Sequence, residues 1–264
     1  MDSLARLGNA APFYDEGRGY DVFGLDPRSL AAVVDLVAPL YERYFRVESS
    51  GIEHLPARGP TIVVANHGGF LPVDGALLCL DLVRRSDPPR IPRPVADHFV
   101  PRLPLVSAFL ARMGAISGTR ANVRRLLLRD ELLVIFPEGV TGPAKPYRDR
   151  YRLQDWRVGF AEHAIRFAAP VVPAAIIGAE ESWPLLAKLP LRMFGAPYLP
   201  IPASPLPLPA HVRIVYGAPI ELHRGHTAED AADPELVARA AARVREALEA
   251  LIAGALRARD GVFR

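Results

Sequence analysis

Residues Thr61-Ile62-Val63-Val64-Ala65 form an apolar run that passes directly into the polar sequence Asn66-His67-Gly68-Gly69. A short continuous apolar run is typical of a strand that is buried on both faces of a sheet. A second run, Leu132 to Ile135, leads in the same way into Phe136-Pro137-Glu138-Gly139. Open α/β sheets place their chemistry beyond the carboxyl ends of the strands. We therefore expect the two polar loops to converge on one site.

Strand and helix patterns alternate along the chain. The strand candidates are Phe45 to Glu48, Thr61 to Ala65, Arg93 to Ala96, Leu132 to Phe136, Val171 to Ile177 and Val212 to Tyr216. The helical patterns are Asp74 to Arg84, Leu103 to Met113, Arg120 to Arg129, Asp155 to Ala168 and Pro234 to Arg259. This alternation predicts a single-domain α/β fold in which helices flank a mixed, largely parallel sheet.

The N-terminal residues divide into an arm and a helix. Residues 1–27 show no periodicity, and we expect this arm to be ordered only where it docks on the rest of the protein. From Arg28 to Arg46, apolar residues recur at helical spacing, with charged residues mainly on the other face. Such a helix either packs on the core or lies in the interface of a bilayer. We assign residues 1–47 to this arm and amphipathic helix, and residues 48–264 to the main domain.

The stretch from Trp183 to Pro209 is rich in proline, leucine and aromatic residues. Its prolines argue against a regular helix or a central strand, yet it is too apolar for an ordinary solvated loop. It is expected either to pack across the sheet or to offer a surface to lipid or an acyl chain.

The chain is mildly basic, with a net charge of +3 and a pI near 9.2 over 264 residues. Only Lys145 and Lys188 are lysines, so arginine supplies nearly all of the positive charge. Either anionic partners such as phosphate head groups and membranes, or a high-GC coding bias, accounts for this excess. Nucleic-acid binding is not predicted, because no basic stripe is interleaved with stacking aromatic residues.

Cys79 is the only cysteine, which excludes an intramolecular disulfide and a multi-cysteine zinc site. No apolar run reaches the roughly 18 residues of a membrane span, and the first residues lack the pattern of a secretory signal. We expect a cytoplasmic protein that is peripheral on the inner face of the cell membrane, with no metal and no bound cofactor. The oligomeric state is left open.

His67 is the candidate general base, because an imidazole can accept a proton at neutral pH and a nearby carboxylate can fix its tautomer. Asp74 opens the next helical pattern and could turn back toward His67. The alternative readings are a structural histidine and a helix cap. The chain has no G-x-S-x-G elbow, Walker A loop, G-x-G-x-x-G fingerprint or H-E-x-x-H motif. What remains is base catalysis on a hydroxyl carried by the substrate.

Four segments resemble the sequence blocks of the PlsC-like glycerolipid acyltransferases, a superfamily that includes the lysophospholipid acyltransferases. In chain order they are Asn66-His67 with Asp74, Gly114 to Arg120, Phe136 to Gly139 and Ala169 to Ala174. The flanking segments Tyr44 to Val47 and Tyr216 to Ile220 are similar to bacterial members near monoacylglycerol and diacylglycerol acyltransferases.

The resemblance implies a role for each matching residue. His67 would deprotonate the acceptor hydroxyl while Asp74 orients it, and the oxygen would attack the thioester of an acyl-CoA or acyl-carrier-protein co-substrate. Arg120 would grip the polar head of a lipid acceptor, for which its planar donor fork suits phosphate. Glu138 and Gly139 would line the acceptor site. We add one inference of our own, that backbone amides near Gly68 are available as oxyanion donors.

This chain departs from the family pattern at two places. Gly68 to Val73 place six residues between His67 and Asp74, two more than usual, so this segment must bulge if the side chains are to meet. Its glycines make such a bulge feasible. Val140-Thr141 stands where many members carry an arginine after Glu-Gly, which weakens the case for a phosphorylated acceptor over mono- or diacylglycerol. Arg148, Arg150 and Arg152 are candidates to replace that arginine, or form a solvated basic loop.

Two other functions remain open at this point. A lipid- or membrane-binding module could keep the fold without activity, and a wide separation of His67 from Asp74 would favour it. An esterase or thioesterase would use water in place of the acceptor hydroxyl.

Overall fold

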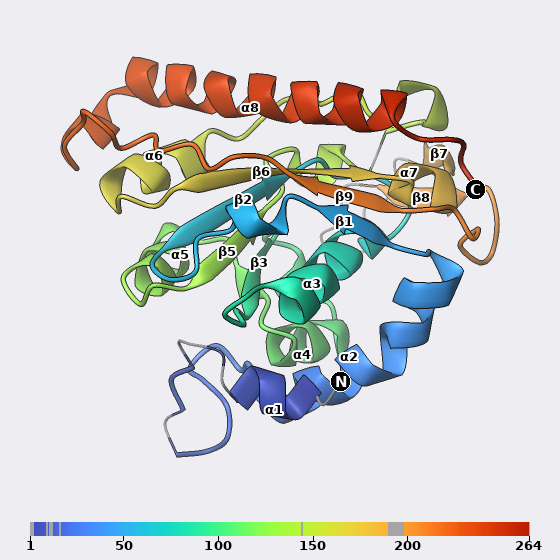
Figure 1. The fold of residues 1–264 in the computed structure, drawn as a ribbon, viewed down its shortest axis with the longest axis horizontal. Helices are drawn as coiled ribbons and strands as arrows, with labels where there is room; N and C mark the ends of the chain where they lie inside the picture. Colours follow the sequence, from blue (N-terminus) through green and yellow to red (C-terminus); the bar gives the residue numbers. More distant parts are fainter. Residues whose placement is uncertain are drawn as a thin grey trace.

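The structure is a computed structural model that describes residues 3–8, 10, 13–15, 17–143, 145–189 and 198–263. Its centre is a seven-stranded sheet in the order β1-β9-β6-β2-β5-β3-β4 (Figure 1). The strands are β1 (Glu48–Ser50), β2 (Thr61–Ala65), β3 (Pro92–Ala96), β4 (Ile116–Ser117), β5 (Leu132–Ile135), β6 (Val171–Ile177) and β9 (Arg213–Tyr216). All neighbouring pairs are parallel except β6 and β9. The predicted mixed, largely parallel sheet is therefore confirmed.

Helices cover both faces of this sheet. The α-helices are α1 (Ser3–Gly8), α2 (Pro27–Pro39), α3 (Val73–Arg85), α4 (Val106–Arg112), α5 (Arg120–Leu127), α6 (Gly159–Arg166), α7 (Ala179–Ser182) and α8 (Pro234–Arg257). Short 3-10 turns lie at Ile52–His54, Val100–Arg102, Gly139–Thr141, Tyr147–Asp149 and Asp230–Ala232. Figure 1 shows α8 and α6 on one side of the sheet and α1, α2 and α3 on the other.

Alternate side chains of β2 serve the two faces, as the strand period of two requires. Ile62 and Val64 pack in one buried cluster with α5, α6 and α8, whereas Val63 and Ala65 pack in the other with α3. The side chains of all five β2 residues are buried. This double burial explains why the strand reads as a continuous apolar run.

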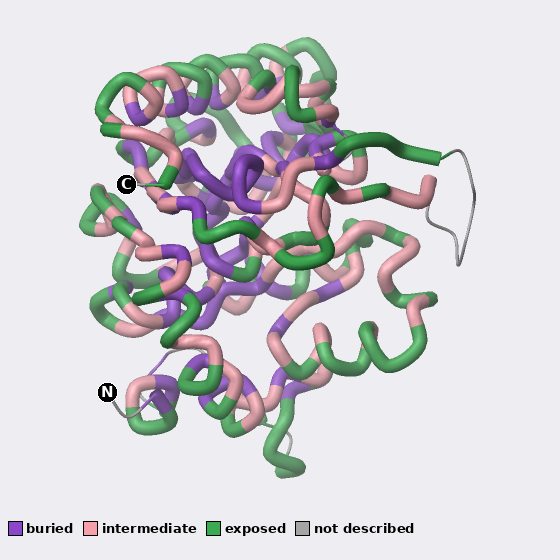
Figure 2. The backbone as a smooth tube through the Cα atoms, turned by 90° about the vertical axis from the view of Figure 1, so that its right-hand side faces the viewer, coloured by how far each residue is buried: buried purple, intermediate pink, exposed green. Residues whose placement is uncertain are grey.

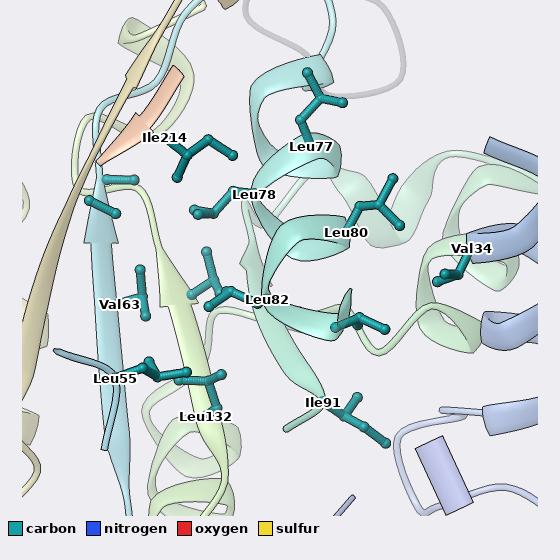
Figure 3. Close-up of a cluster of buried hydrophobic side chains, with 14 of the residues drawn as sticks. Val34, Leu55, Val63, Leu77, Leu78, Leu80, Leu82, Ile91, Leu132 and Ile214 are labelled. Carbon is teal, nitrogen blue, oxygen red and sulfur yellow. The ribbon is translucent and has the colours of Figure 1, made fainter. Parts of the chain in front are cut away.

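Helix α3 fills the space between the sheet and α2. Figure 3 shows Leu78 and Leu82 directed toward Val63 and the sheet, while Leu80 is directed toward Val34 of α2. Because α3 follows directly on the loop after β2, this packing fixes where the loop must end. The start of α3 is thereby held close to the end of β2.

The N-terminal segment packs on the same side as α3. Leu7, Leu25, Leu30 and Val34 belong to the buried cluster that includes α3, and Asp21 forms an ion pair with buried Arg93 of β3 at 2.6 Å. Residues 1–27 were expected to lack periodic structure, but Ser3–Gly8 forms a helical turn and a half. The apolar face of α2 thus packs on the core.

The helix predicted from Arg28 to Arg46 ends earlier, at Pro39, and continues as a π-helical turn over Leu40–Tyr44. Proline has no amide N–H, so the regular hydrogen-bond ladder breaks there. The Phe45 amide then donates to the carbonyl of Leu40 at 2.8 Å. The strand expected at Phe45 to Glu48 begins only at Glu48.

The proline-rich stretch forms a hairpin instead of the expected loop. Strands β7 (Leu185–Leu189) and β8 (Leu199–Pro202) pair antiparallel in a sheet of their own, and Figure 2 shows them projecting from the body of the molecule. Both strands of such a ribbon have a free edge, which tolerates prolines that cannot donate a hydrogen bond. Residues 190–197, within the same predicted stretch, lie outside the described residues.

Among the described residues, we find no helix with the length and hydropathy that a membrane span needs.

Candidate active site

Asn66 ties the end of β2 to its neighbour β6. Its side-chain amide donates to the carbonyl of Ile176 at 2.9 Å, and its side-chain oxygen accepts from the Ile176 amide at 2.8 Å. The Asn66 side chain thus bonds to the backbone of β6 as a strand residue would, and it extends the link between β2 and β6 by one residue. His67 is the next residue and leaves the sheet from a fixed point at its carboxyl edge.

The His67 ring meets the carboxylate of Asp74. Nδ1 of His67 lies 2.7 Å from Oδ2 of Asp74, and the same oxygen accepts the Gly68 amide at 2.8 Å. The other carboxylate oxygen accepts the Gly75 amide at 2.7 Å. Asp74 is 1% exposed, so these contacts are not shared with bulk water. The six-residue spacing is compatible with close contact of the two side chains.

The two additional residues of this loop are accommodated by an outward bulge. Gly69 has a φ of +97°, a backbone conformation that side chains rarely allow. The Phe70 amide then donates to the carbonyl of Trp183 at 3.0 Å, and the two aromatic rings pack edge to face with centroids 4.9 Å apart. Leu71 is half-exposed at the turn before α3. Trp183 therefore holds the bulge away from the His67–Asp74 contact.

The second loop packs directly on His67. The Phe136 ring stacks on the imidazole with centroids 4.4 Å apart and an interplanar angle of 30°. Gly142 approaches so closely that an added Cβ would lie 2.7 Å from the His67 Cβ. The His67 side chain is 14% exposed, and its Nε2 makes no hydrogen bond within the part of the chain that the structure describes. The two loops converge as expected, with Nε2 left for a substrate.

Glu138 supports His67 from beneath instead of facing an open site. Its side chain is fully buried; Oε1 accepts the His67 amide at 2.9 Å and Oε2 accepts the Gln154 amide at 2.9 Å. Lys145 lies 3.3 Å from Oε2. With its oxygens occupied inside the protein, the carboxylate differs from the acceptor-lining group that we expected.

Gly139 lies against an arginine that the sequence did not single out. A Cβ at Gly139 would lie 3.1 Å from the guanidinium carbon of Arg157, which pairs with Asp97 at 3.0 Å. The Arg157 amide also donates to the carbonyl of Pro137 at 3.0 Å. Its side chain is 61% exposed. A largely exposed cation, paired with Asp97, thus lies beside the Glu138–Gly139 loop, and a role for Gly139 in acceptor binding stays a prediction.

Arg120 lies at the start of α5, after the edge strand β4. Its side chain is 77% exposed, and its guanidinium lies 2.8 Å from a carboxylate oxygen of Glu162. Strands β5 and β3 separate β4 from β2, which corresponds to about 14 Å at the usual strand spacing. Arg148 and Arg152 pair with Asp149, and Arg150 pairs with Glu181. The role of Arg120 in gripping a head group remains a prediction.

The Gly68 amide differs from our expectation. Backbone amides near Gly68 were predicted as oxyanion donors, but the N–H of Gly68 itself is already donated to Asp74. The bulged loop turns the carboxylate back onto this amide, and a role for the neighbouring amides stays a prediction.

A family model described as Acyltransferase matches residues 46–177, which contain all four sequence blocks. The chain belongs to this acyltransferase family. The enzyme is 38% identical over 255 residues to an uncharacterized protein of Mycobacterium tuberculosis, covering 92% of this chain and 71% of the relative. It is 27% identical over 230 residues to a human protein named DGAT1/2-independent enzyme synthesizing storage lipids, covering 85% and 65%.

The fold of this acyltransferase matches a solved structure. The crystal structure of the 1-acyl-sn-glycerophosphate acyltransferase PlsC from Thermotoga maritima aligns with a TM-score of 0.57 at 18% identity, covering 89% of this chain and 83% of that one. At this identity the match shows the fold alone.

The geometry of the acyltransferase site suits proton transfer. With Nδ1–H donated to a buried carboxylate, the lone pair of the neutral ring lies on Nε2. The carboxylate would stabilise the imidazolium that forms when Nε2 takes a proton. In the described ranges, no cluster of three or more His, Cys, Asp or Glu side chains could hold a metal ion.

Sequence reasoning missed two residues near the candidate site besides Arg157. Lys145 and Glu180 are both buried and form an ion pair at 3.2 Å. Lysine is rarely buried without a partner, and the chain contains only two lysines, so the position of Lys145 near Glu138 was an available signal.

Proposed function

We propose that this acyltransferase transfers a fatty acyl group from a thioester donor, either acyl-CoA or acyl carrier protein, to a hydroxyl group of a glycerolipid. His67 is the general base and Asp74 orients it. The observation that carries this proposal is the 2.7 Å contact between His67 Nδ1 and Asp74 Oδ2, after which Nε2 makes no hydrogen bond to any described residue.

The proposed reaction is a single acyl transfer. Nε2 of His67 takes the proton of the acceptor hydroxyl while the oxygen attacks the thioester carbonyl. The tetrahedral intermediate collapses with cleavage of the carbon–sulfur bond, and the imidazolium returns its proton to the leaving thiolate. The ester and the free thiol are the products, and the base ends in its starting state.

The class of acceptor follows from the relatives and from Arg157. The human relative is named for storage-lipid synthesis, and the Thermotoga structure is titled as an acyltransferase of 1-acyl-sn-glycerophosphate. Both names point to glycerolipids. The Arg157 side chain, exposed beside the Glu138–Gly139 loop and paired with Asp97, supports an acceptor with an anionic head group, since arginine can bind phosphate oxygens through two donors.

The same geometry argues against one of the two alternative functions, and product analysis separates the other. A lipid-binding module without activity has no need of a buried carboxylate held on an imidazole, and the two groups are within hydrogen-bond reach. A hydrolase would need water in place of the acceptor, which product analysis distinguishes from transfer.

We also propose peripheral attachment to the membrane, through α4 and the β7–β8 hairpin. Helix α4 has no buried residue, and Leu105 at its start is 86% exposed with Phe109 at 50%. Leu186 of β7 is 67% exposed on the hairpin that projects in Figure 2. Exposed apolar side chains of this size are typical of surfaces that contact lipid or another protein.

A screen of acceptors with one radiolabelled acyl-CoA tests the proposed reaction. The purified enzyme is incubated with lysophosphatidic acid, other lysophospholipids, monoacylglycerol, diacylglycerol or no acceptor, and the products are identified by mass spectrometry. We expect an acylated glycerolipid and free CoA in equal amounts. Release of free fatty acid at the same rate with and without acceptor would instead identify a thioesterase.

A further inference from the structure

A buried ion cluster lies behind the loop that carries His67. The Lys145 ammonium is 3.3 Å from Oε2 of Glu138 and 3.2 Å from Oε1 of Glu180. The three side chains are 2%, 0% and 6% exposed. One ammonium thus faces two carboxylates in a place that water barely reaches, and the cluster carries one excess negative charge when both carboxylates are ionised.

Both carboxylates also contact the backbone around His67. Glu138 accepts the His67 amide at 2.9 Å. Glu180 packs on the next residue, because a Cβ added to Gly68 would lie 2.4 Å from the Glu180 Cγ and 2.8 Å from its Oε1. The cluster therefore meets this loop twice, by a hydrogen bond at His67 and by packing at Gly68.

The other charged groups near Glu180 have partners of their own. On its own helix, Glu181 pairs with Arg259 at 2.7 Å and with Arg150 at 3.7 Å, and it accepts the Tyr151 hydroxyl. The backbone amide of Tyr151 lies 3.2 Å from each Glu180 oxygen.

On the opposite side of Gly68 lies the anion Asp74, which is bonded to His67. In the described part of the chain, Lys145 is the cation that pairs with Glu180. Burial raises the pKa of Glu180 to about 7, with Lys145 opposing the rise.

We propose that Lys145 and Glu180 are positioning residues for His67, and that the proton on Glu180 decides how Lys145 is shared. With Glu180 protonated, Lys145 neutralises Glu138, and the His67 amide is held firmly. With Glu180 ionised, the two carboxylates compete for one ammonium and repel each other across the loop. The base is then held less well, and transfer slows. This inference rests on the proposed role of His67.

The first test is the pH dependence of acyl transfer in a Glu180→Gln variant. The wild-type rate should fall as the pH rises through about 7, where Glu180 ionises, and the variant should lose this alkaline fall. Gln can still accept hydrogen bonds from Lys145 and the Tyr151 amide. An unchanged alkaline limb in the variant would overturn the proposal.

Glu131→Gln is the matched control. Glu131 is also buried, and burial raises its pKa to about 7, but it precedes β5 at the end opposite to the Glu138 loop. Folding raises the pKa of such a carboxyl group from its ordinary value of 4.5 to about 7. The folded protein then keeps a proton that the unfolded chain loses, so stability falls as the pH rises from 4.5 to about 7. Both Gln variants should therefore flatten the pH dependence of thermal unfolding. Only Glu180→Gln should change the pH profile of activity.

A charge-balance test uses Lys145. Lys145→Met should lower kcat by about 10-fold near pH 8 with KM changed less, because an ill-placed base slows the chemical step. Adding Glu180→Gln should restore much of that rate, since one of the two unpaired carboxylates is removed. A double variant no more active than Lys145→Met would contradict the sharing of one cation.

A readout without turnover separates this inference from the proposed function. In a His67→Gln background, which lacks the imidazole, the NMR signal of the Gly68 amide should shift with a midpoint near pH 7. The shift should disappear when Glu180→Gln is added. Its persistence would overturn the role of Glu180 whatever the activity, whereas full activity in His67→Gln would overturn the proposed role of His67 as the base.

Discussion

One oxygen of Asp74 accepts hydrogen bonds from both the His67 ring and the Gly68 amide, at 2.7 and 2.8 Å. The orientation of the imidazole and the closure of the bulged loop therefore depend on the same atom. This coupling explains how an insertion of two residues can be accommodated. The additional chain leaves through Gly69 and Phe70 while the carboxylate stays on the ring.

Asp74→Asn should lower kcat/KM by about 10²- to 10⁴-fold, because the amide cannot replace the charge that orients and stabilises the imidazolium. Assays of acyl transfer and of thermal unfolding on the purified variant measure the effect on catalysis and the effect on stability separately. Asp81→Asn is the control on the same helix. Asp81 is buried and accepts the Tyr216 hydroxyl at 2.7 Å, so its loss should lower stability and leave kcat near that of wild type. Equal losses of kcat in both variants would argue against a specific role for Asp74.

Gly142→Ala should reduce activity, because the new methyl group would lie 2.7 Å from the His67 Cβ and 2.8 Å from its carbonyl oxygen. The ring or the Glu138 loop must then move, and small misplacements of a base are costly. Gly254→Ala provides the comparison, since nothing lies within 4 Å of its Cβ position in α8. That variant should be as active as wild type and more stable by about 0.5–1 kcal/mol. Wild-type kinetics in Gly142→Ala would show that the close packing on His67 is dispensable.

Arg157→Ala should raise KM for phosphorylated acceptors by about 10-fold or more and leave neutral acceptors little affected, since a charge-assisted contact would be lost. Arg148→Ala is the control, because Arg148 is 86% exposed and its partner Asp149 is 3.7 Å away. Steady-state kinetics with lysophosphatidic acid and with monoacylglycerol measure the effect on a phosphorylated and on a neutral acceptor. An equal effect on both acceptors would remove the phosphate role.

Leu105→Asp and Phe109→Asp should weaken binding to anionic liposomes in a sedimentation assay at low salt. Leu36→Asp serves as the comparison, because Leu36 is 76% exposed but belongs to α2, whose apolar face is buried. We expect that variant to bind like wild type. If all three variants bind equally well, α4 is not the attachment surface.

The centre of the fold could be predicted from the sequence because its strands are buried on both faces. β2 and β6 were predicted with their observed bounds, since a continuous apolar run has sharp ends. The two-residue strand β4 was missed, because its position depends on pairing with β3 and not on its own composition. The hairpin was missed because its prolines suggest a loop unless the free edges of a two-stranded ribbon are considered.

Some residues of the candidate site could likewise be predicted from the sequence, and others could not. His67 and Asp74 were found because the base and its carboxylate lie in one loop, seven positions apart. Lys145 and Glu180 are 35 positions apart, and Arg157 meets Asp97 from a different loop. Such contacts come from the packing of the loops on one another, which no local pattern encodes. Glu138 was identified by its motif, but its burial beneath His67 was visible only in the structure.

The most direct measurement is the rate of acyl transfer by purified His67→Ala, with the acceptor that the screen identifies. If His67 is the general base, the rate should fall by about 10²- to 10⁴-fold while the unfolding temperature stays close to that of wild type. Full activity in a folded His67→Ala protein would contradict base catalysis by His67.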